Sequence, residues 1–197
     1  MADRPLIPCH VVAGPPGVGK TSAILDFLRR RPAGERVGVL VNDFGPVGLD
    51  GATIEAEAPG TAVLNVPGGC ICCSMLAELP DRIRRLTVDE GVDRLVIEPS
   101  GIAAPAHVLE LLRRDGRELG ISARPTIALL NVAEFDEETY GRSAYERAFY
   151  EPAEILVFNR SDQAGEAWIE RARAAAAALD PPKRRVIVTS HGTLPRE

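Results

Sequence analysis

Short apolar runs alternate along this chain with longer segments in which apolar residues recur every three or four positions. The short runs favour buried strands, and the periodic segments favour amphipathic helices. The predicted strands cover residues 7–13, 36–41, 62–66, 94–97, 126–130, 155–158 and 186–188, and the predicted helices cover residues 20–30, 77–87, 105–114, 137–149 and 166–179. Pro80 is expected in the first turn of its helix, where a missing N–H is tolerated.

This alternation of strand and helix predicts an α/β fold with a mainly parallel sheet that is covered on both faces. The 197 residues suit one folded unit. We therefore expect a single domain over residues 1–197, and we interpret Pro181-Pro182 as the end of the last helix rather than as a linker.

The composition is that of a globular protein, with 45% hydrophobic and 26% charged residues. The 28 acidic residues outnumber the 23 basic ones, which argues against a nucleic-acid-binding surface. No apolar run is long enough for a membrane span and the first residues are unlike a signal peptide, so a cytoplasmic location is expected. Thiols stay reduced there, so four cysteines indicate metal binding, catalysis or core packing. Cys9 lies inside the first strand and is expected in the core.

The segment between the first strand and the first helix, Gly14-Pro15-Pro16-Gly17-Val18-Gly19-Lys20-Thr21, fits the phosphate-loop pattern G-x-x-x-x-G-K-[ST]. Phosphates are expected to bind along it and at the helix N-terminus, near Gly14, Gly17, Val18, Gly19 and Ser22. Lys20 is expected to reach the β- and γ-phosphates, and the Thr21 hydroxyl to bind Mg²⁺. The loop predicts a P-loop NTPase with a three-layer α/β/α architecture. It does not by itself separate an ATPase, a GTPase and a small-molecule kinase.

A polar segment, Asn159-Arg160-Ser161-Asp162, follows the predicted strand at 155–158. It is similar to the N-K-x-D motif of GTPases, with arginine in the lysine position. The Asp162 carboxylate can accept hydrogen bonds from N1–H and the 2-amino group of guanine, whereas adenine offers no matching pair of donors. Asn159 is expected to tie the loop to nearby backbone, and the stem of Arg160 to lie over the purine. Residues 188–190 are a weaker candidate for a second base-contacting loop.

Three thiols fall within four residues in Pro67-Gly68-Gly69-Cys70-Ile71-Cys72-Cys73. This segment follows a strand, so it is expected at the carboxyl edge of the sheet, where ligand-binding loops collect. Thiolates favour Zn²⁺, Cu(I) or iron–sulfur centres, with Co²⁺ and Ni²⁺ also open. Cys70 and Cys72 share one side of an extended chain, and a turn at the two glycines brings in Cys73.

Two or three thiolates leave a tetrahedral position open, which suits a metal that is passed on. Two alternatives remain for the same residues. Cys70 and Cys73 form a C-x-x-C pair that is typical of redox sites, and one or two of the cysteines can be buried hydrophobic residues.

Together these motifs resemble the CobW family of P-loop GTPases, whose relatives include the nickel-insertion GTPases of urease and hydrogenase. The resemblance covers nearly the whole chain. It rests on the phosphate loop at 14–21, Asn42-Asp43-Phe44-Gly45 with Asp50 after it, Gly69 to Cys73, Glu98-Pro99-Ser100-Gly101, and Asn159 to Asp162. It implies GTP hydrolysis coupled to delivery of a transition metal, most often zinc or cobalt, to a client metalloprotein.

The candidate catalytic residues are Lys20, Glu98 and Asp43, and the candidate metal ligands are Cys70, Cys72 and Cys73. The family commonly has N-E-F-G, so Asp43 is one methylene shorter than usual, and a ligand role for it stays open. Members usually carry a further C-terminal domain, which is not expected in these 197 residues. A homodimer is a further expectation.

A coupled mechanism follows as a hypothesis. GTP is expected to order residues 42–50 through the γ-phosphate and Mg²⁺, and metal binding at the cysteines is expected to depend on that order. Glu98 is expected to position the attacking water or to bind Mg²⁺ through water, and the Gly101 N–H to approach the γ-phosphate. His107 is interpreted as a surface residue rather than a metal ligand. The other functional hypotheses are a regulatory GTP switch with structural cysteines, a nickel-insertion accessory GTPase and a small-molecule kinase.

Overall fold

The computed structural model of the chain describes residues 5–41, 49–65, 74–99, 105–134 and 143–195. In these residues eight strands form one sheet, and the paired strands all run parallel. The strands are β1 (Ile7–Ala13), β2 (Val37–Val41), β3 (Ala62–Asn65), β4 (Arg94–Glu98), β5 (Ile121–Ala123), β6 (Ile127–Asn131), β7 (Ile155–Asn159) and β8 (Arg185–Val188). Their order is β3-β2-β4-β1-β6-β7-β8, and β5 also pairs with β1.

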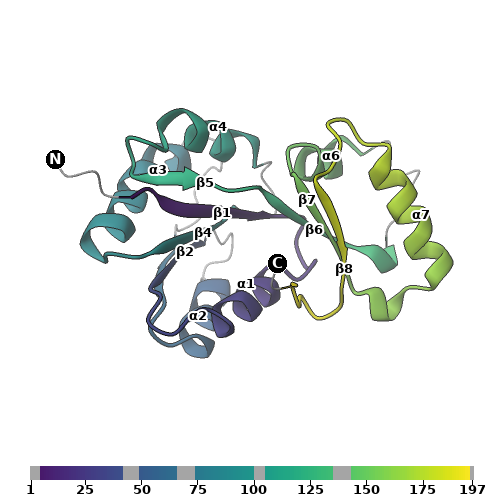
Figure 1. Ribbon diagram of the computed structural model, residues 1–197, viewed down its shortest axis with the longest axis horizontal. Coiled ribbons are helices and arrows are strands. Elements are labelled where there is room, and N and C mark those ends of the chain that lie inside the picture. The colour runs from purple at the N-terminus through teal and green to yellow at the C-terminus, as the bar shows by residue number, and fades with distance from the viewer. Residues whose placement is uncertain (1–4, 42–48, 66–73, 100–104, 135–142, 196–197) are drawn as a thin grey trace.

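Helices cover both faces of this sheet, as Figure 1 shows. They are α1 (Lys20–Arg29), α2 (Leu49–Glu57), α3 (Ser74–Arg84), α4 (Ala106–Asp115), α6 (Ala144–Tyr150) and α7 (Glu166–Ala177), with the π-helix η1 (Arg85–Asp89) and the 3₁₀ helices η2 (Val132–Glu134) and η3 (Ser161–Gln163). Helices α1 and α2 pack on one face, and α3, α4, α6 and α7 pack on the other. The predicted three-layer α/β/α architecture is confirmed.

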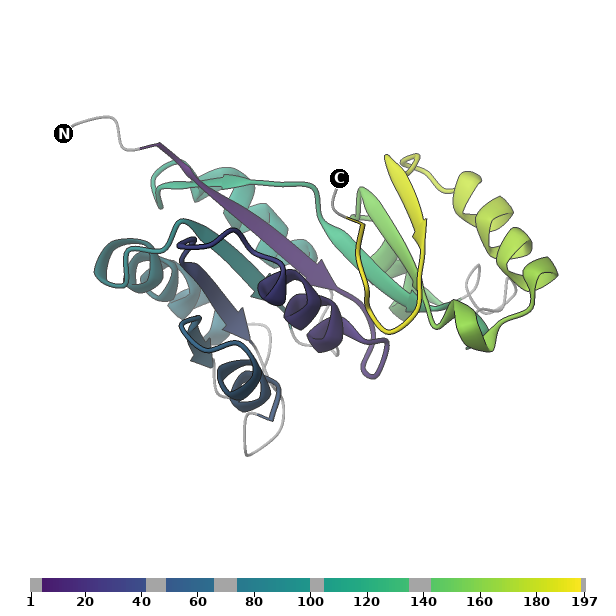
Figure 2. The same cartoon turned by 60° about the horizontal axis from the view of Figure 1, so that its bottom comes forward.

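Alternating side chains of each strand reach the two opposite cores. In β4, Leu95 and Ile97 pack with α3 and α4, whereas Val96 packs on the side of α1 and α2. In β7, Val157 joins the α1 side and Phe158 packs with α6 and α7. Figure 2 shows the purple strand β1 running through the twisted sheet with α1 alongside it, so the loop that joins them sits centrally at one edge.

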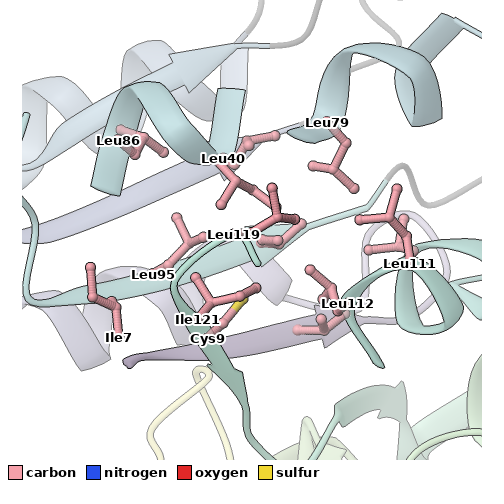
Figure 3. Close-up of a cluster of buried hydrophobic side chains, with 14 of the residues drawn as sticks. Ile7, Cys9, Leu40, Leu79, Leu86, Leu95, Leu111, Leu112, Leu119 and Ile121 are labelled. Carbon is pink, nitrogen blue, oxygen red and sulfur yellow. The ribbon is translucent and has the colours of Figure 1, made fainter. Parts of the chain in front are cut away.

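Cys9 of β1 is a core residue, as predicted. It is 1% exposed, and Figure 3 shows it among the labelled leucine and isoleucine side chains of the core that the sheet forms with α3 and α4. Burial raises the pKa of the Cys9 thiol to about 12. The thiol is therefore protonated at neutral pH and packs as a small hydrophobic group.

Two elements of the structure are not predicted by the apolar pattern of the sequence. Helix α2 begins at Leu49, where a loop to residue 50 is expected, and in its described part it buries Ile54. Strand β5 has only three residues. β1 pairs through Ile7 with Ile121 and through Val12 with Ile127, so one extra residue lies between β5 and β6, as in a β-bulge.

The position predicted for Pro80 is wrong. Helix α3 begins at Ser74, three residues before the predicted start, so Pro80 lies inside the helix rather than in its first turn. The helix continues through the proline because Leu79 and Ile83 are fully buried against the sheet. The remaining predicted elements agree with the structure within two residues at the ends that it describes; residues 137–142 of one predicted helix lie outside the described residues.

Candidate nucleotide and metal site

The predicted phosphate loop connects the carboxyl end of β1 to the N-terminus of α1. The φ angles are 142° at Gly14, 75° at Gly17 and 97° at Gly19, in the range that favours glycine. A Cβ at Gly14 would lie 2.5 Å from the carbonyl oxygen of Leu129, so the loop passes too close to β6 for a side chain. Gly19 is the N-cap residue of α1, and as a glycine it has no side chain to accept from the first N–H groups of the helix. The first N–H groups of α1 are thus placed to bind an anion.

Lys20 and Glu98 meet at this edge of the sheet. The Lys20 ammonium donates a hydrogen bond to the Pro15 carbonyl at 3.1 Å and lies 3.7 Å from Oε1 of Glu98. Both side chains are buried, with 8% and 4% of their surfaces exposed. Opposite charges this close offset part of the cost of burying each one. The pair places a cation and a carboxylate beside the cradle of backbone N–H groups.

The other phosphate-loop candidates fall in the same short stretch. Val18 is buried, Thr21 is half-buried in the first turn of α1, and Ser22 is exposed next to it. Thr21 therefore follows Lys20 directly, at the position from which a hydroxyl can reach a phosphate-bound Mg²⁺.

Asn159 ties three loops together. It ends β7 with 3% of its surface exposed. Its Nδ2 donates to the Val18 carbonyl at 2.9 Å, and its Oδ1 accepts from the Gly192 N–H at 3.0 Å. A Cβ at Gly19 would overlap the same Nδ2, so the loop and the amide are in close contact. The predicted hydrogen bond of Asn159 to nearby backbone is confirmed by its bond to Val18. The second bond, to Gly192, is not predicted, because nothing in the sequence around Gly192 indicates it.

Arg160 and Asp162 continue the same segment after Asn159. Arg160 has a φ of 61°, and its Nη2 donates to the Gly17 carbonyl at 2.7 Å, so its guanidinium group reaches the phosphate loop. Asp162 is exposed in η3. The Ser161 N–H donates to the Thr189 carbonyl at 3.0 Å, which joins this segment to residues 188–190. A contact of Asp162 with guanine stays a prediction.

The register of the sheet brings three strand ends to one level. Val41, the last residue of β2, pairs with both Asn65 and Glu98, the last residues of β3 and β4. The thiol segment, residues 66–73, follows Asn65 directly. Strand β3 lies three positions from β1, which at about 4.8 Å per strand is roughly 14 Å. The thiol segment therefore leaves the sheet at the edge that holds the phosphate loop.

Five candidate residues lie outside the described residues, namely Asp43, Gly101, Cys70, Cys72 and Cys73. Their roles stay predictions. In the described part of the chain, no group of three or more His, Cys, Asp and Glu side chains could hold a metal ion. His107 is exposed in the first turn of α4, which agrees with its interpretation as a surface residue. No helix in the described ranges is long and apolar enough to cross a membrane.

His10 lies away from this edge, on the side of the sheet that α1 covers. It borders a cavity of about 540 Å³ together with Phe27 and Arg30. Nη1 of Arg94 lies 3.1 Å from its Nε2, and because a guanidinium only donates, Nε2 accepts. Burial, followed by the charges of Arg94 and Arg124, lowers the pKa of His10 to about 4. The ring is therefore neutral at pH 7.

Known proteins resemble this chain over most of its length. A family model described as CobW/HypB/UreG, nucleotide-binding domain, matches residues 8–187. The zinc chaperone YeiR of Escherichia coli K12 is 34% identical over 154 residues, which is 78% of this chain and 46% of that protein. The zinc chaperone YjiA of the same organism is 30% identical over 194 residues, 90% of this chain and 56% of that protein. The chain thus spans about half the length of these curated relatives.

Solved structures share its fold. HypB from Helicobacter pylori in complex with nickel superposes with a TM-score of 0.66 at 16% identity, covering 94% of this chain and 79% of that one. Zn(II)-bound YjiA GTPase from Escherichia coli gives a TM-score of 0.57 at 21% identity, covering 94% and 57%. These values establish a common architecture around the phosphate loop.

Proposed function

Because the chain belongs to the CobW/HypB/UreG family of nucleotide-binding domains, we propose that it hydrolyses GTP and couples hydrolysis to the binding and transfer of zinc. The single observation that carries this proposal is the shared edge of the sheet. Glu98 of the buried Lys20–Glu98 pair stands at the same register level as Asn65, after which the three thiols follow. A triphosphate and a metal ion bound there are near enough to interact.

The chemistry at the phosphate loop follows from its charges. The first N–H groups of α1 and the Lys20 ammonium stabilise the negative charge of the β- and γ-phosphates. The Thr21 hydroxyl would hold a Mg²⁺ ion, and such an ion would supply positive charge to the phosphate oxygens. Glu98, a buried carboxylate 3.7 Å from Lys20, orients the attacking water. Asp162 accepts from the guanine ring and gives GTP its advantage over ATP.

Zinc is the proposed cargo. Cys70, Cys72 and Cys73 supply thiolates, and relatives of this chain at 30% identity or more are zinc chaperones. Cobalt is the second metal that this ligand set suits. Loss of the γ-phosphate lowers the affinity for zinc, which is then released to a client metalloprotein.

Two measurements on the whole chain test this function. Phosphate release is expected to be faster from GTP than from ATP without any added acceptor, which also excludes a kinase. Equilibrium dialysis is expected to give about one zinc per chain. The double variant Cys72→Ser/Cys73→Ser should lose the zinc and keep GTP binding, whereas the matched variant Cys9→Ala should keep both.

The opposite outcome is equally clear. Zinc that stays bound in the double variant shows that the thiol segment does not carry the metal. A wild-type chain that hydrolyses GTP but binds no zinc favours a regulatory GTP switch in place of the proposed chaperone.

A further inference from the structure

A cavity of about 540 Å³ lies on the face of the sheet that α1 covers. Small-molecule sites usually enclose about 300–1,000 Å³, so this volume is within their range. In the described residues its lining contains none of positions 14–21, so the cavity is separate from the phosphate loop. Most of the lining is apolar, and its walls include Val12, Ile24, Phe27, Val96, Ile127 and Leu194.

The apolar walls come from the sheet, from α1 and from the segment after β8. Val12 of β1 and Val96 of β4 are buried, and Ile127 at the start of β6 is half-buried. The Leu194 N–H donates to Oδ2 of Asp26 at 3.0 Å, which holds the segment after β8 against α1. An apolar group that enters between these walls leaves water and gains free energy by doing so.

His10 of β1 also borders the cavity, and its hydrogen-bonding capacity is only half used. Its Nε2 accepts from Nη1 of Arg94 at 3.1 Å. The neutral ring therefore holds its proton on Nδ1. No acceptor for this Nδ1–H lies among the described residues. His10 thus offers a hydrogen-bond donor to a ligand in the cavity.

The charges around His10 do not balance. Two guanidinium groups are already paired with carboxylates, in Arg30–Asp26 and Arg94–Glu35. A third, that of Arg124, is exposed, and it has no ion-pair partner in the part of the chain that the structure describes. After burial, the charges of Arg94 and Arg124 lower the pKa of His10, so both groups act on the ring. One positive charge is therefore left for an anion beside the Nδ1–H donor.

We propose that this cavity binds a small amphipathic carboxylate, whose hydrocarbon chain lies between α1 and the sheet and whose carboxylate meets His10 and Arg124. The hydrocarbon chain covers the apolar walls. The anion accepts from the Nδ1–H and balances the third guanidinium group. This site is independent of the proposed GTP and zinc chemistry.

The size of the cavity favours a free small molecule over a helical segment of another protein. A helix with its side chains is about 10 Å across and fills roughly 400 Å³ per turn. The 540 Å³ of the cavity therefore hold little more than one turn. A single turn is too short to form a stable helix in water.

Calorimetric titration of the whole chain with octanoate tests the class of ligand. One octanoate is expected to bind per chain, with hexanoate weaker and decanoate tighter by up to about fourfold for each methylene. Octylamine has the same chain and the opposite charge, so it should bind at least about tenfold more weakly than octanoate. Octanoate that does not saturate at one site, or octylamine with equal affinity, overturns the proposal.

Variants at Arg124 test the position of the carboxylate. Arg124→Ala removes the unpaired charge and should weaken octanoate by about tenfold, whereas Arg124→Lys keeps the charge and should stay within about threefold of wild type. The side chain is exposed, so both variants should fold. The matched control is Arg173→Ala, at an exposed arginine of α7 on the opposite face, which should keep the wild-type affinity. Equal octanoate affinity in Arg124→Ala and wild type overturns this placement.

The apolar part of the site is tested at Ile127. The larger ring of Ile127→Trp occupies the cavity, so octanoate binding should be lost while thermal unfolding shows a folded chain. A folded Ile127→Trp variant that binds octanoate like wild type contradicts a hydrocarbon chain in this cavity.

A spectroscopic measurement locates the ligand without any variant. The chain has three histidines, and in NMR spectra the ring signals of His10 should shift when octanoate is added. Those of His107 and His191, which are exposed, should stay in place. Octanoate that binds without shifting the His10 signals lies elsewhere and overturns the proposal.

Discussion

The two ends of the carboxyl edge are built differently. The nucleotide end, around β1 and β7, uses buried polar side chains: Lys20 bonds the Pro15 carbonyl, and both polar atoms of the Asn159 amide bond the backbone of other loops. The thiol end, around β2 and β3, uses Asn65, which is exposed, and Arg82, which is half-buried and whose Nη1 donates to the Asn65 carbonyl at 3.1 Å. Its fit depends on the missing side chain of Gly51.

This difference has consequences for mutation. A buried polar group that loses its partner costs far more than an exposed one, because it cannot turn to water. Changes at the nucleotide end should therefore reduce affinity, and at buried positions stability too. Changes at Asn65 and Arg82 should leave both nearly intact, because these residues are exposed or half-buried. The nucleotide end is held by buried hydrogen bonds, and the thiol end by more exposed contacts.

The largest effect is expected for Lys20→Ala. The variant removes the cation that faces the phosphates and leaves Glu98 buried without it, so GTP hydrolysis should fall by about 1000-fold. Release of phosphate under saturating GTP measures the loss. The control is Lys183→Ala, at the chain's other lysine, whose ammonium donates to the carbonyls of Glu151 and Ala153 and whose loss should leave the rate unchanged. Equal rates in wild type and Lys20→Ala would contradict the role of this end.

Asn159→Ala should affect stability and nucleotide affinity together. It leaves the Val18 carbonyl and the Gly192 N–H without their partner, at a cost of about 2–4 kcal/mol in unfolding free energy. GTP affinity should fall by about tenfold or more, since the phosphate loop loses its anchor. Asn131, its register neighbour on β6, accepts a local bond from the Ala133 N–H, and within the described residues it has no bond to a distant loop. Urea titration should therefore show a smaller loss of unfolding free energy for Asn131→Ala than for Asn159→Ala. Equal losses would contradict the role of Asn159 as the anchor of the phosphate loop.

His10 provides a test of stability that is separate from both ends. Its pKa is 6.5 when unfolded and about 4 when folded, so between these values the unfolded chain binds a proton that the folded chain does not. Stability from this residue is present above pH 6.5 and is lost as the pH falls toward 4. The full loss is about 3 kcal/mol. Urea unfolding at pH 7 and pH 5 should show a smaller decrease for His10→Gln than for wild type; parallel decreases would contradict this assignment.

The smallest effect is expected for Arg160→Ala. Its hydrogen bond to the Gly17 carbonyl is solvent-exposed, so its removal should cost about 0.5–1.5 kcal/mol, or roughly twofold to twelvefold in affinity. Because this bond supports the phosphate loop, GTP and GDP should lose affinity by similar factors. Calorimetric titration with both nucleotides measures this. A loss confined to GTP would place the guanidinium at the γ-phosphate instead.

The parts of the fold that sequence predicts are those set by neighbouring residues. Strand β1 is predicted over its full length because apolar residues dominate the seven positions Ile7–Ala13. The phosphate loop is predicted because its glycines fix the backbone within eight residues. Asn159 is predicted to tie loops together because a polar amide at the end of a buried strand needs partners.

The missed features depend on residues far apart in the chain. Gly192 is 33 residues from Asn159, and nothing near it signals their hydrogen bond. Helix α2 shows no apolar stripe, and Gly51 within it reads as a helix breaker until its contact with Asn65 is known. Pro80 reads as a first-turn residue because sequence cannot show that buried leucine and isoleucine side chains hold the helix on both sides of it.

The central claim is that the phosphate loop and the thiol segment affect each other from one edge of the sheet, and the affinity for GTP tests it most directly. Binding of a non-hydrolysable GTP analogue is measured with and without saturating zinc. Linkage requires zinc to tighten the nucleotide by the same factor by which the nucleotide tightens zinc, on the order of 5–150. We predict this equality in the wild-type chain and its loss in Cys72→Ser/Cys73→Ser. Identical nucleotide affinities with and without zinc in the wild-type chain would contradict the account.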